Sequence, residues 1–239
     1  MNITLIGFMG TGKTTVGKQL AKRLGWQFVD VDALIQGRTK KTIPDIFAEH
    51  GEAVFRRLER REIRRVARGD EQVITTGGGA FVHAQNRRWL RATGPVICLR
   101  AAPRVILQRV RPTLSARPML ARAPALLPRI RQLMAQRAPA YAKADLVIDT
   151  SLLSVDDVVE QIWSTVSPWM AKSWQYLLAH REQLAQRYAG KYIAVLDDRI
   201  VAVGASHLQA YRGIRRPIPA NREVAIYYIP VQPDAAVVR

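Results

Sequence analysis

The fold is decided by the stretch Gly7-Phe8-Met9-Gly10-Thr11-Gly12-Lys13-Thr14, which fits the phosphate-loop pattern Gly-x4-Gly-Lys-[Ser/Thr]. The short apolar run before it, Asn2–Ile6, predicts a buried strand. The residues after it, Thr15–Leu24, repeat apolar side chains at helical spacing and are followed by Gly25, which is typical of a helix end. Strand, glycine-rich loop and helix thus follow one another in the order that the pattern requires.

This loop predicts a site for the phosphates of a nucleotide. Its glycines let backbone N–H groups turn inward and form a nest for phosphate oxygens. The N-terminus of the following helix adds partial positive charge at the same place. In this pattern Lys13 can reach the terminal phosphates, and the hydroxyl of Thr14 can bind Mg²⁺.

The chain is strongly basic. Its 239 residues include 37 Lys and Arg against 19 Asp and Glu, a formal net charge of +18. A nucleic-acid or membrane-surface partner is one interpretation, and an enzyme with anionic substrates and an arginine-rich surface is the other. The basic residues are scattered and form no block of the kind found in nucleic-acid-binding tails. We therefore favour the enzyme, and expect no specific nucleic-acid partner.

Cysteine usage and the lengths of the apolar runs indicate the cellular compartment of the protein. The single cysteine, Cys98, lies in an apolar run that predicts a buried strand thiol, and one cysteine allows no internal disulfide. No signal peptide precedes the first predicted strand, and no apolar run approaches the roughly 18 residues that span a bilayer. We expect a cytoplasmic monomer with no membrane partner.

Strand and helix patterns alternate along the first two thirds of the chain. Further strands are predicted at Gln27–Val29, Gln72–Thr75, Val96–Leu99 and Leu146–Asp149. Helical segments are predicted at Ala33–Gln36, Thr42–His50, Glu52–Ala67, Val82–Leu90, Pro103–Val110, Leu126–Gln136 and Val155–Val166. The proline-rich segment Arg111–Pro124 predicts a mobile loop, and Arg137-Ala138-Pro139 predicts a helix end. The alternation predicts an α/β fold, a five-stranded parallel sheet with helices on both faces and ligands at the carboxyl ends of its strands.

The remaining third predicts a separate small module. A helix at Ser173–Tyr188 precedes a hairpin, Tyr192–Leu196 with Ile200–Val203, then a helix at Ser206–Arg212 and a strand at Val224–Ile229. We expect a domain at residues 1–167 and an α+β domain of order α-β-β-α-β at 173–232. The α+β domain resembles a small uncharacterised domain found on various proteins, and the sequence assigns it no chemistry.

Five further motifs follow the phosphate loop. They are Asp30-x-Asp32, Gly51-Glu52-x-x-Phe55-Arg56-x-x-Glu59, Gly77-Gly78-Gly79, Arg117-Pro118 and Arg137-x-x-x-Tyr141. In this order and spacing they resemble shikimate kinase, over roughly residues 1–167. The resemblance implies a P-loop NTPase fold and an ATP-dependent kinase that phosphorylates the 3-hydroxyl of shikimate, giving shikimate 3-phosphate and ADP in chorismate and aromatic amino acid biosynthesis.

The resemblance also implies a role for individual residues. ATP contacts are implied for Gly10, Thr11, Gly12, Lys13, Thr14, Thr15, Arg109 and Arg117. Magnesium ligation is implied for Thr14 and Asp30. Shikimate contacts are implied for Asp32, Arg56, Glu59, Gly77, Gly78, Gly79 and Arg137, and catalytic roles for Lys13, Asp32 and Arg117.

The residue types agree with these roles, although other interpretations stay open. A carboxylate-bearing acceptor needs guanidinium groups for bidentate pairing, and a positioned aspartate can take the proton of an attacking hydroxyl. The two aspartates could instead only cap a helix, and the arginines could form surface ion pairs. The rival functions are a kinase for gluconate or a nucleoside monophosphate, and a nucleotide-gated nucleic-acid-binding protein.

Overall fold

The structure, a computed structural model, describes residues 1–121, 123–167, 172–214, 224–229 and 231. The chain divides into two compact units, Met1–Ile162 and Trp163–Arg239. Within the described ranges, no helix is both long and apolar enough to cross a membrane.

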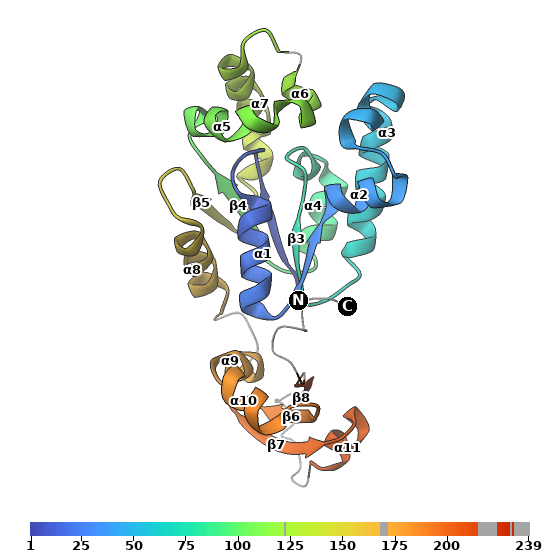
Figure 1. The fold of residues 1–239 in the computed structure, drawn as a ribbon, viewed down its shortest axis with the longest axis vertical. Helices are drawn as coiled ribbons and strands as arrows, with labels where there is room; N and C mark the ends of the chain where they lie inside the picture. The colour runs from blue at the N-terminus through green and yellow to red at the C-terminus, as the bar shows by residue number, and fades with distance from the viewer. Residues whose placement is uncertain (122, 168–171, 215–223, 230, 232–239) are drawn as a thin grey trace. The chain divides into compact units, whose positions relative to one another are not determined.

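The first unit is the predicted α/β fold, with a five-stranded parallel sheet in the order β2-β3-β1-β4-β5 (Figure 1). Its strands are β1 (Ile3–Gly7), β2 (Gln27–Asp30), β3 (Gln72–Thr75), β4 (Val96–Arg100) and β5 (Leu146–Asp149). Its helices are α1 (Lys13–Leu24), α2 (Val31–Thr39), α3 (Ile43–Val66), α4 (Ala84–Arg91), α5 (Pro103–Val110), α6 (Pro118–Ala121) and α7 (Leu126–Tyr141), with the 3-10 helices η1 (Ala80–Val82) and η2 (Arg111–Ala116). Helix α8 (Val155–Val166) begins in this unit and ends in the next. Because β1 is the central strand, the phosphate loop leaves the middle of the sheet.

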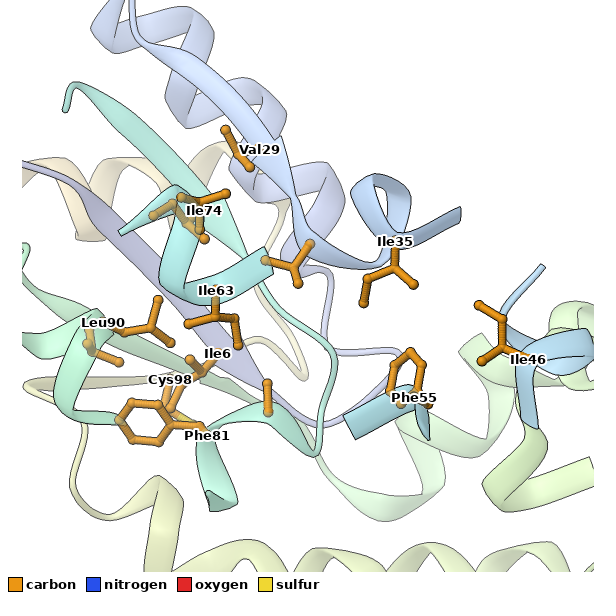
Figure 2. Close-up of a cluster of buried hydrophobic side chains, with 14 residues drawn as sticks. Ile6, Val29, Ile35, Ile46, Phe55, Ile63, Ile74, Phe81, Leu90 and Cys98 are labelled. Carbon is orange, nitrogen blue, oxygen red and sulfur yellow. The ribbon is translucent and has the colours of Figure 1, made fainter. Parts of the chain in front are cut away.

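Helices cover both faces of this sheet. On one face Ile63 of α3 and Leu90 of α4 pack with the strand residues Ile6, Ile74 and Cys98 in one buried cluster (Figure 2). Burial of that cluster holds α3 and α4 against the sheet, because apolar area removed from water stabilises the fold by roughly 25 cal/mol per Å².

The opposite face is covered by α1. A Cβ added at Gly17 of this helix would lie 2.8 Å from side-chain atoms of Phe28 and Thr75. Those two residues alternate along β2 and β3 with members of the first cluster, so they point to the other face of the sheet. Helix and sheet therefore approach so closely at Gly17 that no larger residue fits.

Glycines shape the phosphate loop as the pattern requires. Gly7 ends β1 at φ 136°, and a Cβ there would lie 2.0 Å from the carbonyl oxygen of Leu99. Gly12 adopts the left-handed conformation, with φ 91°, directly before α1. Gly25, with φ 69°, ends α1 as predicted, and its N–H donates to the carbonyls of Ala21 and Lys22. The loop is thus bent where only glycine is unstrained.

Helix α3 carries the predicted Phe-Arg-x-x-Glu stretch and is kinked before it. Thr42 and Asp45 form a capping box at its start, so the N-terminus is well defined. Gly51, at φ 75° and ψ 171°, interrupts the helix where the sequence predicts a break. The second half, from Glu52 onward, therefore runs in its own direction and presents Arg56 and Glu59 on one face.

Two segments of the first unit differ from the prediction. The expected loop Arg111–Pro124 contains η2 and α6, because Leu120 is fully buried with Ile130 and anchors them without a long periodic pattern. Helix α7 continues past Pro139 to Tyr141. A proline removes one backbone hydrogen bond, and here the buried residues around it keep the last turn in place.

The second unit is a small α+β module. Its three-stranded antiparallel sheet, in the order β7-β6-β8, consists of β6 (Tyr192–Leu196), β7 (Arg199–Gly204) and β8 (Val224–Tyr228). Its helices are α9 (Lys172–Ala179), α10 (Arg181–Tyr188) and α11 (His207–Arg212). The single helix predicted at Ser173–Tyr188 is therefore two helices, which separate at His180, where φ is −113° and ψ is 15°. Residues 215–223, 230 and 232 of the predicted module lie outside the described residues.

Candidate active site

A cavity of about 490 Å³ opens at the carboxyl edge of the parallel sheet. It is lined by the phosphate loop and its helix, by the residues that follow β2, β3 and β5, and by two arginines from the segment around η2. The lining residues are Met9, Gly10, Thr11, Gly12, Lys13, Thr14, Thr15, Val16, Asp30, Asp32, Thr75, Thr76, Gly77, Gly78, Arg109, Arg117, Thr150, Leu153, Ser154, Val155 and Val158. Every residue predicted to bind ATP therefore lines this cavity.

Lys13 lies in the loop with its amine inside the cavity wall. Its Nζ donates to the carbonyl oxygen of Phe8 at 2.8 Å, and the Thr11 hydroxyl donates to the same oxygen at 2.8 Å. Burial lowers the pKa of the Lys13 amine to about 8, against the opposing effect of Asp32. A partly buried ammonium at the N-terminus of α1 is a strong site for the negative charge of phosphate.

Thr14 and Asp30 come together beside the loop. The Thr14 hydroxyl donates to Asp30 Oδ2 at 3.1 Å. The other carboxylate oxygen of Asp30 accepts the N–H groups of Asp32 and Ala33 at 3.0 and 3.2 Å and so caps α2. The interpretation that this aspartate caps a helix is therefore correct, and its second oxygen still faces the phosphate loop.

Asp32 follows at the start of α2. Its Oδ1 is buried and, within the described ranges, has no hydrogen-bond partner. Burial, with a smaller contribution from the neighbouring Asp30, raises the pKa of this carboxyl to about 6, although Lys13 opposes the shift. A buried oxygen without a donor is an acceptor ready for a hydroxyl group.

Arg56 is hydrogen-bonded to two glutamates on the same helix, α3. Its Nη1 donates to Glu59 Oε1 and Oε2 at 3.1 and 2.9 Å, and its Nη2 donates to Glu52 Oε1 at 2.9 Å. Glu59 is 1% exposed, and this burial raises the pKa of its carboxyl although Arg56 opposes the shift. The guanidinium is thus held in one orientation by its own helix.

Arg137 approaches from α7. It is only 6% exposed, and its guanidinium carbon lies 5.2 Å from the centroid of the Phe8 ring. Its Nη1 is buried and, among the residues that the structure describes, has no hydrogen-bond acceptor. A buried guanidinium nitrogen in this state has a place for an anionic ligand.

The triple glycine brings these charged groups together. A Cβ added at Gly77 would lie 3.0 Å from Asp32 Oδ1, one at Gly78 would lie 2.9 Å from Arg137 Nη1, and one at Gly79 would lie 2.6 Å from Arg56 Nη2. Each glycine therefore leaves room for a different charged side chain. The lining of this cavity does not include Arg56, Glu59, Gly79 or Arg137. Glu59 and Arg137 reach its edge at Gly77 and Gly78, and Arg56 lies next to them, at Gly79.

The two arginines near the loop have different contacts. Arg109 donates to the Gly10 carbonyl at 3.4 Å and to the hydroxyl and carbonyl oxygens of Thr150 at 3.2 and 2.8 Å. Arg117 lines the cavity, and its Nε donates to the Thr113 hydroxyl at 3.4 Å. Burial lowers the pKa of Arg117, against the effect of Asp32. Both predicted arginines thus reach the same cavity.

The sequence did not indicate one part of this cavity, the segment after β5. The Thr150 hydroxyl donates to the Thr11 carbonyl at 3.2 Å and so ties this segment to the phosphate loop. Leu153 and Ser154 form the neighbouring wall. Only their position in the sequence could have indicated these residues, because they follow a parallel strand at its carboxyl end.

Comparison with known proteins agrees with this geometry. The family model "Shikimate kinase" matches residues 9–167. Shikimate kinases of Symbiobacterium thermophilum and Thermodesulfovibrio yellowstonii are 49% and 45% identical, over 68% and 67% of this chain and 94% and 92% of their own. The solved structure of shikimate kinase from Acinetobacter baumannii in complex with shikimate has a TM-score of 0.67 at 36% identity, covering 70% of this chain and 93% of that chain.

The C-terminal module has a match of its own. The model of a family of unknown function (DUF5678) matches residues 183–232, so the comparison supports an additional C-terminal domain and assigns it no activity. The model that matches residues 9–167 covers more than half of the chain. The chain therefore belongs to the shikimate kinase family.

Proposed function

We infer that this protein transfers the γ-phosphoryl group of ATP to the 3-hydroxyl of shikimate, giving shikimate 3-phosphate and ADP. One observation carries the inference. A buried guanidinium nitrogen of Arg137 without an acceptor and a buried carboxylate oxygen of Asp32 without a donor both lie against the triple glycine, within the described residues. Together they suit a molecule that carries both a carboxylate and hydroxyl groups.

On the donor side, the phosphate loop and Lys13 hold the nucleotide. The N-terminus of α1 and the Lys13 amine place positive charge where the terminal phosphates would bind. Arg109 and the segment around Thr150 border the same cavity and would contact the rest of the nucleotide. Arg117 adds a second cation, which would stabilise charge that develops on the transferred group.

The chemistry of Thr14 and Asp30 fits Mg²⁺. A hydroxyl and a carboxylate oxygen 3.1 Å apart are the hard oxygen donors that this ion prefers. Among the described residues, no three or more His, Cys, Asp or Glu side chains are grouped so that they could hold a metal ion. This agrees with an ion bound by one or two side chains together with substrate phosphates. When bound, Mg²⁺ would neutralise phosphate charge.

On the acceptor side, Arg137 and Arg56 bind the carboxylate of shikimate, and Glu59 orients Arg56. Asp32 holds the 3-hydroxyl and accepts its proton as the new oxygen–phosphorus bond forms and the bond to ADP breaks. Holding the two substrates together in one cavity accounts for much of the rate enhancement, because phosphoryl transfer needs little covalent chemistry from the protein.

The pKa values of Asp32 and Lys13 predict the pH dependence of kcat/KM for ATP, which reports the free enzyme when shikimate is kept well below its own KM. The base must be ionised, so the activity should fall as pH drops through about 6. The amine must be charged, so the activity should fall again as pH rises through about 8. Initial rates between pH 5 and 9.5 test this. A profile without either limb in that range would contradict both assignments.

Acceptor choice tests the function against the nearest rivals. ADP release, measured in a coupled assay, should be rapid on adding shikimate and slow with gluconate or AMP. Equal turnover of all three acceptors would overturn the inference. A control without acceptor measures ATP hydrolysis, which must be subtracted before the comparison.

Three further expectations belong to the same proposal. Domain limits at 1–167 and 173–232 are supported by the division of the chain near residue 162 and by the two family matches. A cytoplasmic location is supported by the buried free thiol of Cys98, whose pKa burial raises to about 11. A monomer without a specific nucleic-acid partner remains our expectation.

A further inference from the structure

Tyr141 is a partly buried titratable group at the site that the proposed chemistry does not use. It ends α7, one helical turn after Arg137. Its ring packs against two core clusters, one centred on the sheet face with Phe81 and the other on Phe8 and Leu133. Its hydroxyl donates to the carbonyl oxygen of Gly78 at 2.5 Å, across 63 residues of sequence. This hydrogen bond joins α7 directly to the triple glycine.

The peptide that receives this hydrogen bond lies at the centre of the site. A Cβ at Gly78 would lie 3.3 Å from the Gly7 carbonyl oxygen and 3.5 Å from the Met9 nitrogen, as well as 2.9 Å from Arg137 Nη1. Gly78 is therefore enclosed between the phosphate loop and the guanidinium. Its neighbours Gly77 and Gly79 lie against Asp32 and Arg56. A shift of the Gly78 peptide would move the acceptor site as a whole.

The phosphate loop is held in place by other hydrogen bonds. The hydroxyls of Thr11 and Thr150 donate to the carbonyls of Phe8 and Thr11, and neither contact involves Tyr141. Loss of the tyrosine hydroxyl should therefore disturb the acceptor side and leave the donor side in place. Burial raises the pKa of Tyr141 to about 12, against the effect of Arg137, so the phenol stays a donor throughout the working pH range.

We propose that Tyr141 is a positioning residue, whose hydroxyl fixes the Gly78 peptide and thereby sets the spacing of Asp32, Arg56 and Arg137 around the shikimate site. The inference rests on the proposed function. It predicts a selective effect, since removing one oxygen atom leaves the partly buried Gly78 carbonyl without this partner and lets the glycine segment move. If Tyr141 acts only in packing, Tyr141→Phe should leave the KM for shikimate unchanged, because phenylalanine preserves the ring.

The test compares the full-length wild type with Tyr141→Phe in the ADP-release assay. We expect the KM for shikimate to rise roughly tenfold, as the loss of one partly buried hydrogen bond implies. The KM for ATP should stay within about twofold, because the loop contacts are intact. The preference for shikimate over its methyl ester should shrink, because Arg137 is no longer held at its distance from the glycines.

Met134→Leu is the matched control. Met134 lies on α7 and, with Tyr141, lines a second, apolar cavity of about 320 Å³, and it has no part in the hydrogen bond. It should leave both KM values and the ester preference unchanged. If the wild type does not phosphorylate shikimate, the proposed function fails. If the wild type does so and Tyr141→Phe shows wild-type KM values and ester preference, the positioning role is refuted. A fall in thermal midpoint with unchanged kinetics likewise assigns Tyr141 to packing.

Discussion

Replacing Lys13 by methionine should lower kcat by at least about 10³-fold, because the variant keeps most of the apolar stem and loses the charge that faces the transferred phosphoryl group. Positive groups that stabilise phosphoryl or oxyanion charge in an enclosed site contribute roughly 10² to 10⁵ in rate. The amine lies in the cavity wall at the N-terminus of α1, where burial lowers its pKa to about 8. The measurement is turnover at saturating ATP and shikimate.

Lys18→Met is the control for this change, because Lys18 lies on the same helix, exposed to solvent and absent from the cavity lining. It should keep wild-type turnover within about twofold, as surface substitutions away from a site usually do. A Lys13→Met enzyme that retains more than a tenth of the wild-type kcat would show that the phosphate charge is neutralised elsewhere.

Asp32→Asn should have two opposite effects, on turnover and on stability. Loss of the base that takes the hydroxyl proton should lower kcat by roughly 10² to 10⁴-fold. The free protein should become more stable, because burial makes the ionised carboxylate costly. Its pKa rises from 3.8 to about 6, which corresponds to up to about 3 kcal/mol at neutral pH. Thermal midpoints and turnover of the same preparations test both.

The stability effect has a defined pH dependence. Below pH 4 the carboxyl is protonated in the folded and the unfolded protein, so wild type and variant should melt alike. Between about pH 4 and 6 the unfolded state ionises first, and the wild type loses stability relative to Asp32→Asn. Above about pH 6 the difference in stability between wild type and Asp32→Asn reaches its full value. An Asp32→Asn melting curve equal to wild type at pH 7.5 would contradict the desolvation argument.

Much of the donor site could be predicted from the sequence because its residues are contiguous. Gly7–Thr14 forms a strand end, a loop and a helix start, so local geometry alone places Lys13 and Thr14. Asp30 was open to two interpretations, as a helix cap or as a metal ligand. The structure shows that one carboxylate oxygen caps α2 while the other accepts from Thr14.

The acceptor site was harder to predict because distant segments form it. The motif Gly77-Gly78-Gly79 alone suggests a turn, whereas the structure assigns each glycine a different charged neighbour, from α2, α7 and α3. No local pattern reveals the contact between Tyr141 and Gly78 or that between Thr150 and the phosphate loop. Similarly, the burial of Leu120, which orders the segment expected to be a loop, depends on packing against Ile130 and Phe8.

The measurement that tests the account most directly compares shikimate with its methyl ester in the wild type and in Arg137→Met. We predict that the wild type prefers shikimate in kcat/KM by about 100-fold, the value of a charge-assisted pair to a buried guanidinium. In Arg137→Met, which keeps an apolar stem and removes the guanidinium, this preference should fall at least about tenfold, because only Arg56 remains to pair with the carboxylate. An equal preference in both enzymes would show that Arg137 does not bind the acceptor carboxylate, and the assignment of this site to shikimate would lose its basis.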